Sequence, residues 1–88
     1  MKIGMCGSME SNDCIITIKD NNQNKNNIMI NSIVDDFFHQ QIEGVIKSVL
    51  DEKNIKGVDI ECNDKGALDF TIKARLLTAI DRYNESVK

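Results

Sequence analysis

The apolar residues of this 88-residue chain change their spacing along the sequence, which limits the folds open to it. Over 14–18 and 58–62, apolar and polar side chains alternate, as is typical of strands with one face in the core and one in water. Over 34–50 and 68–83, apolar residues recur every three or four positions, which predicts two helices that each bury one stripe. A short apolar segment at 28–30 predicts a further strand, so the expected order is β-β-α-β-α.

This order predicts a two-layer α+β domain, in which a three-stranded antiparallel sheet carries two helices on one face. The strands at 14–18 and 28–30 are expected to form a hairpin across the Asn-rich segment 20–27. A crossover through the first helix then returns the strand at 58–62 parallel to that at 28–30, on the far side of 14–18. Numbered along the chain, the expected strand order is 2-1-3.

Individual side chains are expected to begin the helices and fill their stripes. Ser32, with Asp35 three residues later, is expected to cap the first helix, and Asp64 the second. Gly44 inside the first helix indicates a close contact, because glycine otherwise weakens a helix. The residues expected to be buried are Val34, Phe38, Ile42, Val45, Ile46, Val49 and Leu50 in the first helix, and Leu68, Ile72, Leu76, Ala79, Ile80 and Tyr83 in the second.

Charge and cysteine content exclude several classes of protein. With 11 basic and 14 acidic residues, the net charge of −3 argues against the positive surface that a nucleic-acid binder needs. No apolar run approaches the roughly 18 residues of a membrane helix, and the first residues lack a signal-peptide core. Cys6, Cys14 and Cys62 include no C-x-x-C pair, so neither a disulfide framework nor a zinc site is expected. We therefore expect a cytoplasmic protein that binds neither nucleic acid nor membrane.

The sequence contains no free-standing catalytic constellation. His39 is the only histidine and has no Ser, Cys or metal-ligand partner at a useful spacing. A helix start explains Asp35 and Asp36, and a strand face in water explains Asp59 and Glu61.

Two polar stretches are not explained by core burial. The first, Gly7-Ser8-Met9-Glu10-Ser11-Asn12-Asp13, places a serine between two carboxylates. It ends the segment 1–12, which has no sustained period and is expected to be an irregular, flexible leader before a single domain over 13–84. The second stretch, Asp64-Lys65-Gly66-Ala67-Leu68-Asp69, lies where a strand leads into the last helix.

In this order and at this spacing, the two stretches resemble the acyl carrier (gamma) subunit of bacterial citrate lyase. That family has a G-[ST]-x-E-S-x-D segment near the N-terminus, and a D-K-G-A-L-D segment that opens the last helix. An A-R-L stretch follows, present here as Ala74-Arg75-Leu76. The resemblance covers roughly residues 5–83. Phe37, His39 and Phe70 differ from the residues that are common in the family. These differences concern the packing of the domain more than the function of the serine.

The resemblance implies that Ser11 carries 2′-(5″-triphosphoribosyl)-3′-dephospho-coenzyme A through a phosphodiester. This group would hold acetyl and citryl thioesters while citrate is cleaved to acetate and oxaloacetate. The implied partners are an alpha subunit that exchanges acyl groups, a beta subunit that cleaves the citryl group, and the transferase that attaches the prosthetic group. The chain itself would be a non-catalytic carrier, without catalytic or metal-binding residues. Glu10 and Asp13 are expected to guide the transferase, and Ser8 occupies only the variable Ser/Thr position of the motif.

Two other functions remain open. The acyl carrier subunit of malonate decarboxylase has the same type of prosthetic group. A small assembly or ligand-binding module would instead leave Ser11 unmodified. An ordinary fatty-acid acyl carrier is disfavoured, because its serine opens a helix of an all-helical bundle, whereas Ser11 precedes a β-branched strand.

Overall fold

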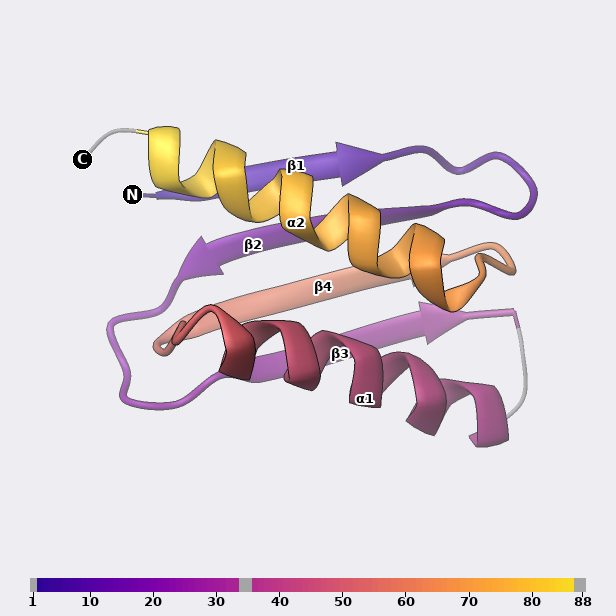
Figure 1. Ribbon diagram of the computed structural model, residues 1–88, viewed down its shortest axis with the longest axis horizontal. Helices are drawn as coiled ribbons and strands as arrows, with labels where there is room; N and C mark the ends of the chain where they lie inside the picture. The colour runs from indigo at the N-terminus through magenta and orange to yellow at the C-terminus, as the bar shows by residue number, and fades with distance from the viewer. Residues whose placement is uncertain (1, 34–35, 87–88) are drawn as a thin grey trace.

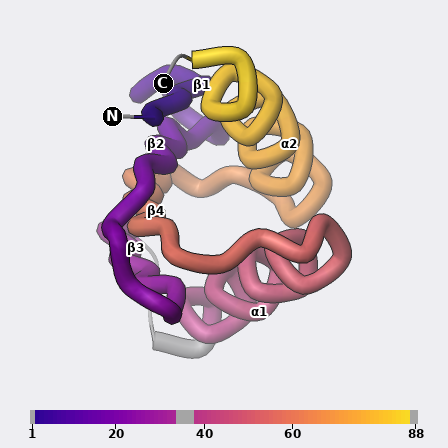
Figure 2. The backbone as a smooth tube through the Cα atoms, turned by 90° about the vertical axis from the view of Figure 1, so that its left-hand side faces the viewer, coloured from indigo at the N-terminus to yellow at the C-terminus, as the bar shows by residue number. Residues whose placement is uncertain are grey.

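The computed structural model describes residues 2–33 and 36–86, and in it a four-stranded sheet carries two helices on one face (Figure 1, Figure 2). The sheet order is β1-β2-β4-β3, in which β3 and β4 are parallel and the other neighbours antiparallel. The α+β class and the placement of both helices on one face are confirmed. In chain order the elements are β1 (Ile3–Gly7), β2 (Cys14–Asp20), β3 (Asn27–Ser32), α1 (Asp36–Glu52), β4 (Val58–Asp64) and α2 (Asp69–Glu85).

The predicted three-stranded antiparallel sheet of order 2-1-3 is wrong. β4 lies between β2 and β3, and Ile28 pairs with Ile60 in parallel register, so the Asn-rich segment closes no hairpin. The segment instead crosses the start of β4. There the Asn26 side chain accepts a hydrogen bond from Val58 N at 3.1 Å and donates one to Ile55 O at 2.9 Å. The crossover through α1 sets its two parallel strands side by side, which gives β4 a partner on each edge.

The expectation that residues 1–12 are irregular is wrong for Ile3–Gly7, which form β1 at the edge of the sheet. The strand escaped detection because Gly4 is one of its two inward positions and adds no apolar side chain. Side chains near the end of α2 cover the outer edge of β1. Ile3 N donates to Ser86 Oγ at 3.0 Å, and Arg82 donates to Met5 O at 2.8 Å. Such cover protects a strand edge from pairing with other chains.

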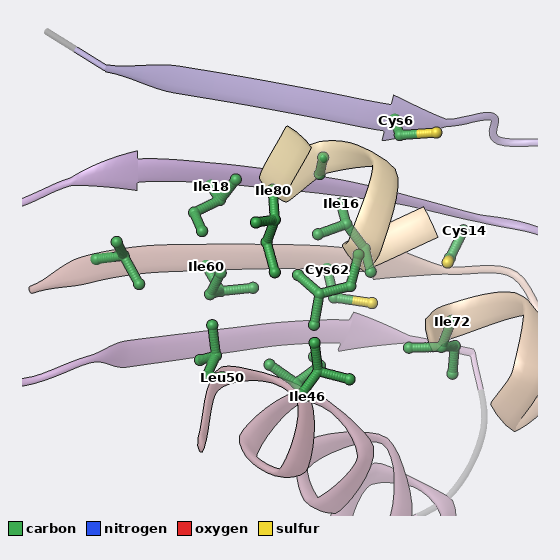
Figure 3. Close-up of a cluster of buried hydrophobic side chains, with 14 of the residues drawn as sticks. Cys6, Cys14, Ile16, Ile18, Ile46, Leu50, Ile60, Cys62, Ile72 and Ile80 are labelled. Atoms are coloured by element: carbon green, nitrogen blue, oxygen red, sulfur yellow. The ribbon is translucent and has the colours of Figure 1, made fainter. Parts of the chain in front are cut away.

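The core lies between the sheet and the two helices, and branched aliphatic residues fill it (Figure 3). Most expected helix residues are buried, but Phe38 and Leu68 are 47% and 60% exposed, and Val34 lies outside the described residues. The contact expected at Gly44 is also wrong, because a Cβ there would meet no atom within 4 Å among the described residues. The buried residues are Cys6, Cys14, Ile16, Ile18, Ile42, Ile46, Val49, Leu50, Val58, Ile60, Cys62, Ile72, Leu76, Ala79, Ile80 and Tyr83.

Candidate functional site

The structure brings the two polar stretches together at one end of the sheet. The loop 8–13 joins β1 to β2 and the turn 65–68 joins β4 to α2, at the same end of the molecule (Figure 1). Asn12 N donates to Lys65 O at 2.8 Å, and Lys65 N donates to Asp13 O at 2.9 Å. These bonds continue the pairing of β2 with β4 and fix the loop against the turn.

Asp13 makes most of the side-chain hydrogen bonds of the loop. Its two carboxylate oxygens accept from Arg75 Nε and Nη2, both at 2.9 Å, which is the paired geometry that a guanidinium offers a carboxylate. The same oxygens accept from Ser8 Oγ and from Cys14 N, each at 2.7 Å. The Arg75 guanidinium, followed by Ser8 and Cys14 N, holds the pKa of the Asp13 carboxyl well below its usual range. Asp13 is therefore ionised, and both of its carboxylate oxygens already accept hydrogen bonds from groups of the same chain.

Asp64 organises the neighbouring turn. It is only 2% exposed, and its oxygens accept from Ser32 Oγ at 2.8 Å, Ala67 N at 2.9 Å and Gly66 N at 3.1 Å. Gly66 has a φ of +91°, a conformation that glycine adopts without strain. The prediction that Asp64 caps the second helix is wrong, because Leu68 is the N-cap residue of α2. Ser32 is the last residue of β3, and the residues directly before α1, where the predicted Ser32 cap would act, lie outside the described part of the chain. Asp35 lies outside the described residues.

The two serines of the loop differ in what their hydroxyls contact. Ser8 Oγ donates to Asp13 and also accepts from Glu10 N at 3.3 Å. Ser11 is exposed, and within 2–33 and 36–86 its hydroxyl has no hydrogen-bond partner. Asp13 N donates to Glu10 O at 3.1 Å, which closes a turn with Ser11 at its second position. At the third position Asn12 has a φ of +67°, which asparagine tolerates better than most residues. Ser11 is thus the open hydroxyl at the tip of a bonded turn.

Among the described residues, neither His39 nor the carboxylates of β4 belong to a second site. His39 is half-buried in α1, and the Asp36 side chain lies outside the described part of the chain. Asp59 accepts from the side-chain amides of Asn21 at 3.0 Å and Asn27 at 2.9 Å, and these bonds lower its pKa. In the described residues no three His, Cys, Asp or Glu side chains are placed to hold a metal ion. Nor is any described helix long and apolar enough to cross a membrane.

The three cysteines are free thiols within the core. Figure 3 shows Cys6, Cys14 and Cys62 on three neighbouring strands. The hydrogen bond with Cys14 and burial raise the pKa of Cys62, so this thiol stays protonated. The cysteines therefore serve packing in the folded chain.

Sequence reasoning missed the pairing of Asp13 with Arg75. The two residues lie 62 positions apart, and no period or turn signal connects them. The A-R-L stretch drew attention to Arg75 without indicating its partner. Because the structure commits Asp13 to contacts within the chain, Glu10 is the flanking carboxylate that remains exposed.

Three comparisons relate the chain to known proteins. The family model described as ACP, malonate decarboxylase delta subunit (MdcD), matches residues 1–83. The citrate lyase acyl carrier protein of Treponema denticola is 42% identical over 92% of this chain and 91% of its own length. That of Clostridium perfringens is 36% identical over 96% and 83%. A chain from the crystal structure of a Pseudomonas malonate decarboxylase hetero-tetramer in complex with malonate has a TM-score of 0.76. It is 14% identical and covers 93% of this chain and 84% of its own, so this likeness concerns the fold alone.

Proposed function

This chain belongs to the citrate lyase acyl carrier protein family, and we propose that it carries acyl groups on a prosthetic group attached to Ser11. The observation that carries the proposal is the contrast between the two loop serines. Ser8 is hydrogen-bonded to Asp13, whereas Ser11 is exposed at the tip of a turn without a partner among the described residues. Attachment at Ser11 would therefore break no hydrogen bond of the described structure.

The proposed donor is 2′-(5″-triphosphoribosyl)-3′-dephospho-coenzyme A, and the group that it would leave on Ser11 is the corresponding 5″-phosphoribosyl-dephospho-coenzyme A. Its attachment forms a bond from Ser11 Oγ to the phosphorus nearest the ribose and breaks the anhydride bond to the outer two phosphates. Pyrophosphate leaves, and the hydroxyl proton passes to a base of the attaching transferase or to water. When attached, the group would supply a terminal thiol able to hold acetyl or citryl as a thioester. The role of the chain is to hold Ser11 at a fixed place and present it to partners.

We propose that the partners are the transferase and the alpha and beta subunits of citrate lyase, with cleavage done by the partner subunits in the cytoplasm. The loop 8–13 and the turn 65–68 would form the docking region. Met9, Leu68 and Phe70, which lie in or next to these segments, are 49%, 60% and 71% exposed, and large apolar side chains at a surface favour protein contacts.

Charge reversal tests this docking region. Lys65→Glu should weaken association with the large subunits and leave the isolated fold intact, because the Lys65 bonds to the loop are made by its backbone. Lys56→Glu, on the connection at the opposite end of β4, is the matched control and should bind normally (Figure 1). Unfolding of the isolated Lys65→Glu chain would make Lys65 structural and refute this part of the proposal.

Intact mass after incubation with the transferase and the triphosphate donor tests the attachment site. The wild type and Ser8→Ala should gain the mass of the group, and Ser11→Ala should gain nothing. The wild type and Ser11→Ala should unfold at similar urea concentrations, because the exposed Ser11 hydroxyl has no hydrogen-bond partner among the described residues. Added mass on a peptide that contains Ser8 but not Ser11 would contradict the assignment.

The second candidate is the carrier subunit of malonate decarboxylase, which the description of the matching family model favours. Purified complexes containing this chain distinguish the two, since one would cleave citrate and the other would decarboxylate malonate. A chain that gains no mass with the transferase of either system, citrate lyase or malonate decarboxylase, would instead be an unmodified module.

A further inference from the structure

We propose that Asp13 and Arg75 form a clamp that directs attachment to Ser11 and away from Ser8, with Asp13 as the positioning residue. The inference rests on the proposed function, because it concerns which hydroxyl the transferase modifies. It follows from the four hydrogen bonds that Asp13 accepts from Arg75, Ser8 and Cys14 N, each between 2.7 and 2.9 Å.

The clamp fixes the end of the loop to α2. The Arg75 guanidinium meets both oxygens of Asp13, so the carboxylate can neither rotate nor shift without breaking a bond. Only 14% of the Asp13 side chain is exposed, against 38% of the Arg75 side chain. On its other side the loop is tied to Lys65 by two backbone bonds. The part left to protrude is the turn that carries Ser11.

The clamp also makes Ser8 a poor acceptor of the prosthetic group. The Ser8 hydroxyl is held between two contacts within the loop, since it donates to Asp13 at 2.7 Å and accepts from Glu10 N at 3.3 Å, so it is not free to turn toward an incoming phosphorus. The donor is a triphosphate, and its negative charge would have to approach the ionised Asp13 carboxylate, which costs free energy. The Ser11 hydroxyl is not held in this way, since it has no hydrogen-bond partner among the described residues. Two serines three positions apart are thus made chemically different by one carboxylate.

Removing the carboxylate should therefore open Ser8 to modification. The full apo chain is incubated with the transferase and the triphosphate donor, and the modified serine is identified by peptide mass. Asp13→Ala should carry the group on both Ser8 and Ser11. The double variant Ser11→Ala/Asp13→Ala should carry it on Ser8, whereas Ser11→Ala alone should stay unmodified. Such a gain is not expected from a loss of folding stability alone. Should Asp13→Ala not fold, Asp13→Asn replaces it, because asparagine keeps one acceptor oxygen and removes the charge.

Arg75 variants measure the positioning effect through rates. Arg75→Ala should lower kcat/KM of attachment by about 10-fold or more, because a displaced acceptor reacts poorly. Arg75→Lys should restore part of the loss, since lysine keeps the charge but cannot donate as a fork. Lys47→Ala is the control, because it breaks the exposed ion pair with Glu43 on α1 and should leave the rate unchanged.

The outcomes separate the two proposals. An unmodified wild type overturns the proposed function and this inference with it. A modified wild type together with no group on Ser8 in either Asp13 variant overturns the clamp alone, and so does an unchanged rate in Arg75→Ala.

Discussion

Replacing Gly4 with alanine tests how closely β1 and α2 must approach to hold the loop 8–13. An alanine Cβ there would lie 2.9 Å from Tyr83 Cα and closer still to Ala79 O and Tyr83 N. All three are backbone atoms of α2, so no side chain can rotate away and the helix itself must shift. Overpacking a core costs about 1–3 kcal/mol, and we expect the upper part of this range, about 3 kcal/mol, because backbone must move.

Gly44→Ala is the matched control, with the opposite sign. Gly44 is exposed in the middle of α1, and an added Cβ would meet no atom within 4 Å among the described residues. Alanine exceeds glycine in helix propensity by about 0.8–1.0 kcal/mol, so this variant should be more stable than the wild type.

Urea unfolding followed by far-ultraviolet circular dichroism measures both changes. With a slope of about 1 kcal/mol/M, Gly4→Ala should lower the midpoint by roughly 3 M, and Gly44→Ala should raise it by up to about 1 M. The loop 8–13 follows β1 directly, so attachment to Ser11 should also slow in Gly4→Ala and not in Gly44→Ala. Equal midpoints for Gly4→Ala and the wild type would refute the close packing of β1 against α2.

Further measurements test the site and the core. Because the pKa of Asp13 is lowered in the folded chain, the contribution of this carboxylate to stability is present above about pH 4 and is lost as the pH falls. In urea titrations from pH 6 to 2.5, Asp13→Asn should therefore lose less stability than the wild type. Cys14 and Cys62 are fully buried, so a thiol reagent should label them only in guanidinium, and rapid labelling of the native chain would contradict their place in the core. Asn26→Ala should cost roughly 1–3 kcal/mol in urea, because it leaves a buried backbone N–H and a carbonyl without partners, whereas the exposed Asn24→Ala should be neutral.

The sequence predicted the strands and helices in which apolar side chains recur with a regular period. The strands at 14–18 and 58–62 and the buried residues from Ile72 to Tyr83 are found where periodicity indicated. The pairing of strands was not predictable in the same way. The sequence predicted only a polar loop for the segment that contains Asn21, Asn26 and Asn27. Their side-chain amides instead donate hydrogen bonds to β4 and to the connection that precedes it, a long-range contact that local composition does not indicate.

The two polar stretches of the site were predicted from the sequence, but their contact with each other was not. Ser11 and the turn 65–68 were singled out from motif spacing, yet only the sheet order sets the turn beside the loop. Asp64 shows the limit of local reasoning, since a carboxylate near a helix start predicts a cap. Its oxygens instead bond Gly66 N, Ala67 N and Ser32 Oγ, which requires β3 to lie next to β4.

The hydrogen bonds of the loop 8–13 limit how far Ser11 can move relative to the rest of the domain. The loop begins at Ser8, whose N donates to Cys14 O at 3.1 Å, and ends at Asp13, which is held by Arg75. If Ser11 carries the acyl group as we propose, a backbone held at both ends gives it little travel, so movement between partner sites would come from the attached group or from motion of the whole domain. On this proposal, the domain would contribute a fixed point and a docking surface. Partners would recognise Ser11 and Glu10 as parts of a defined surface, which explains why the residues around them are committed to contacts within the chain.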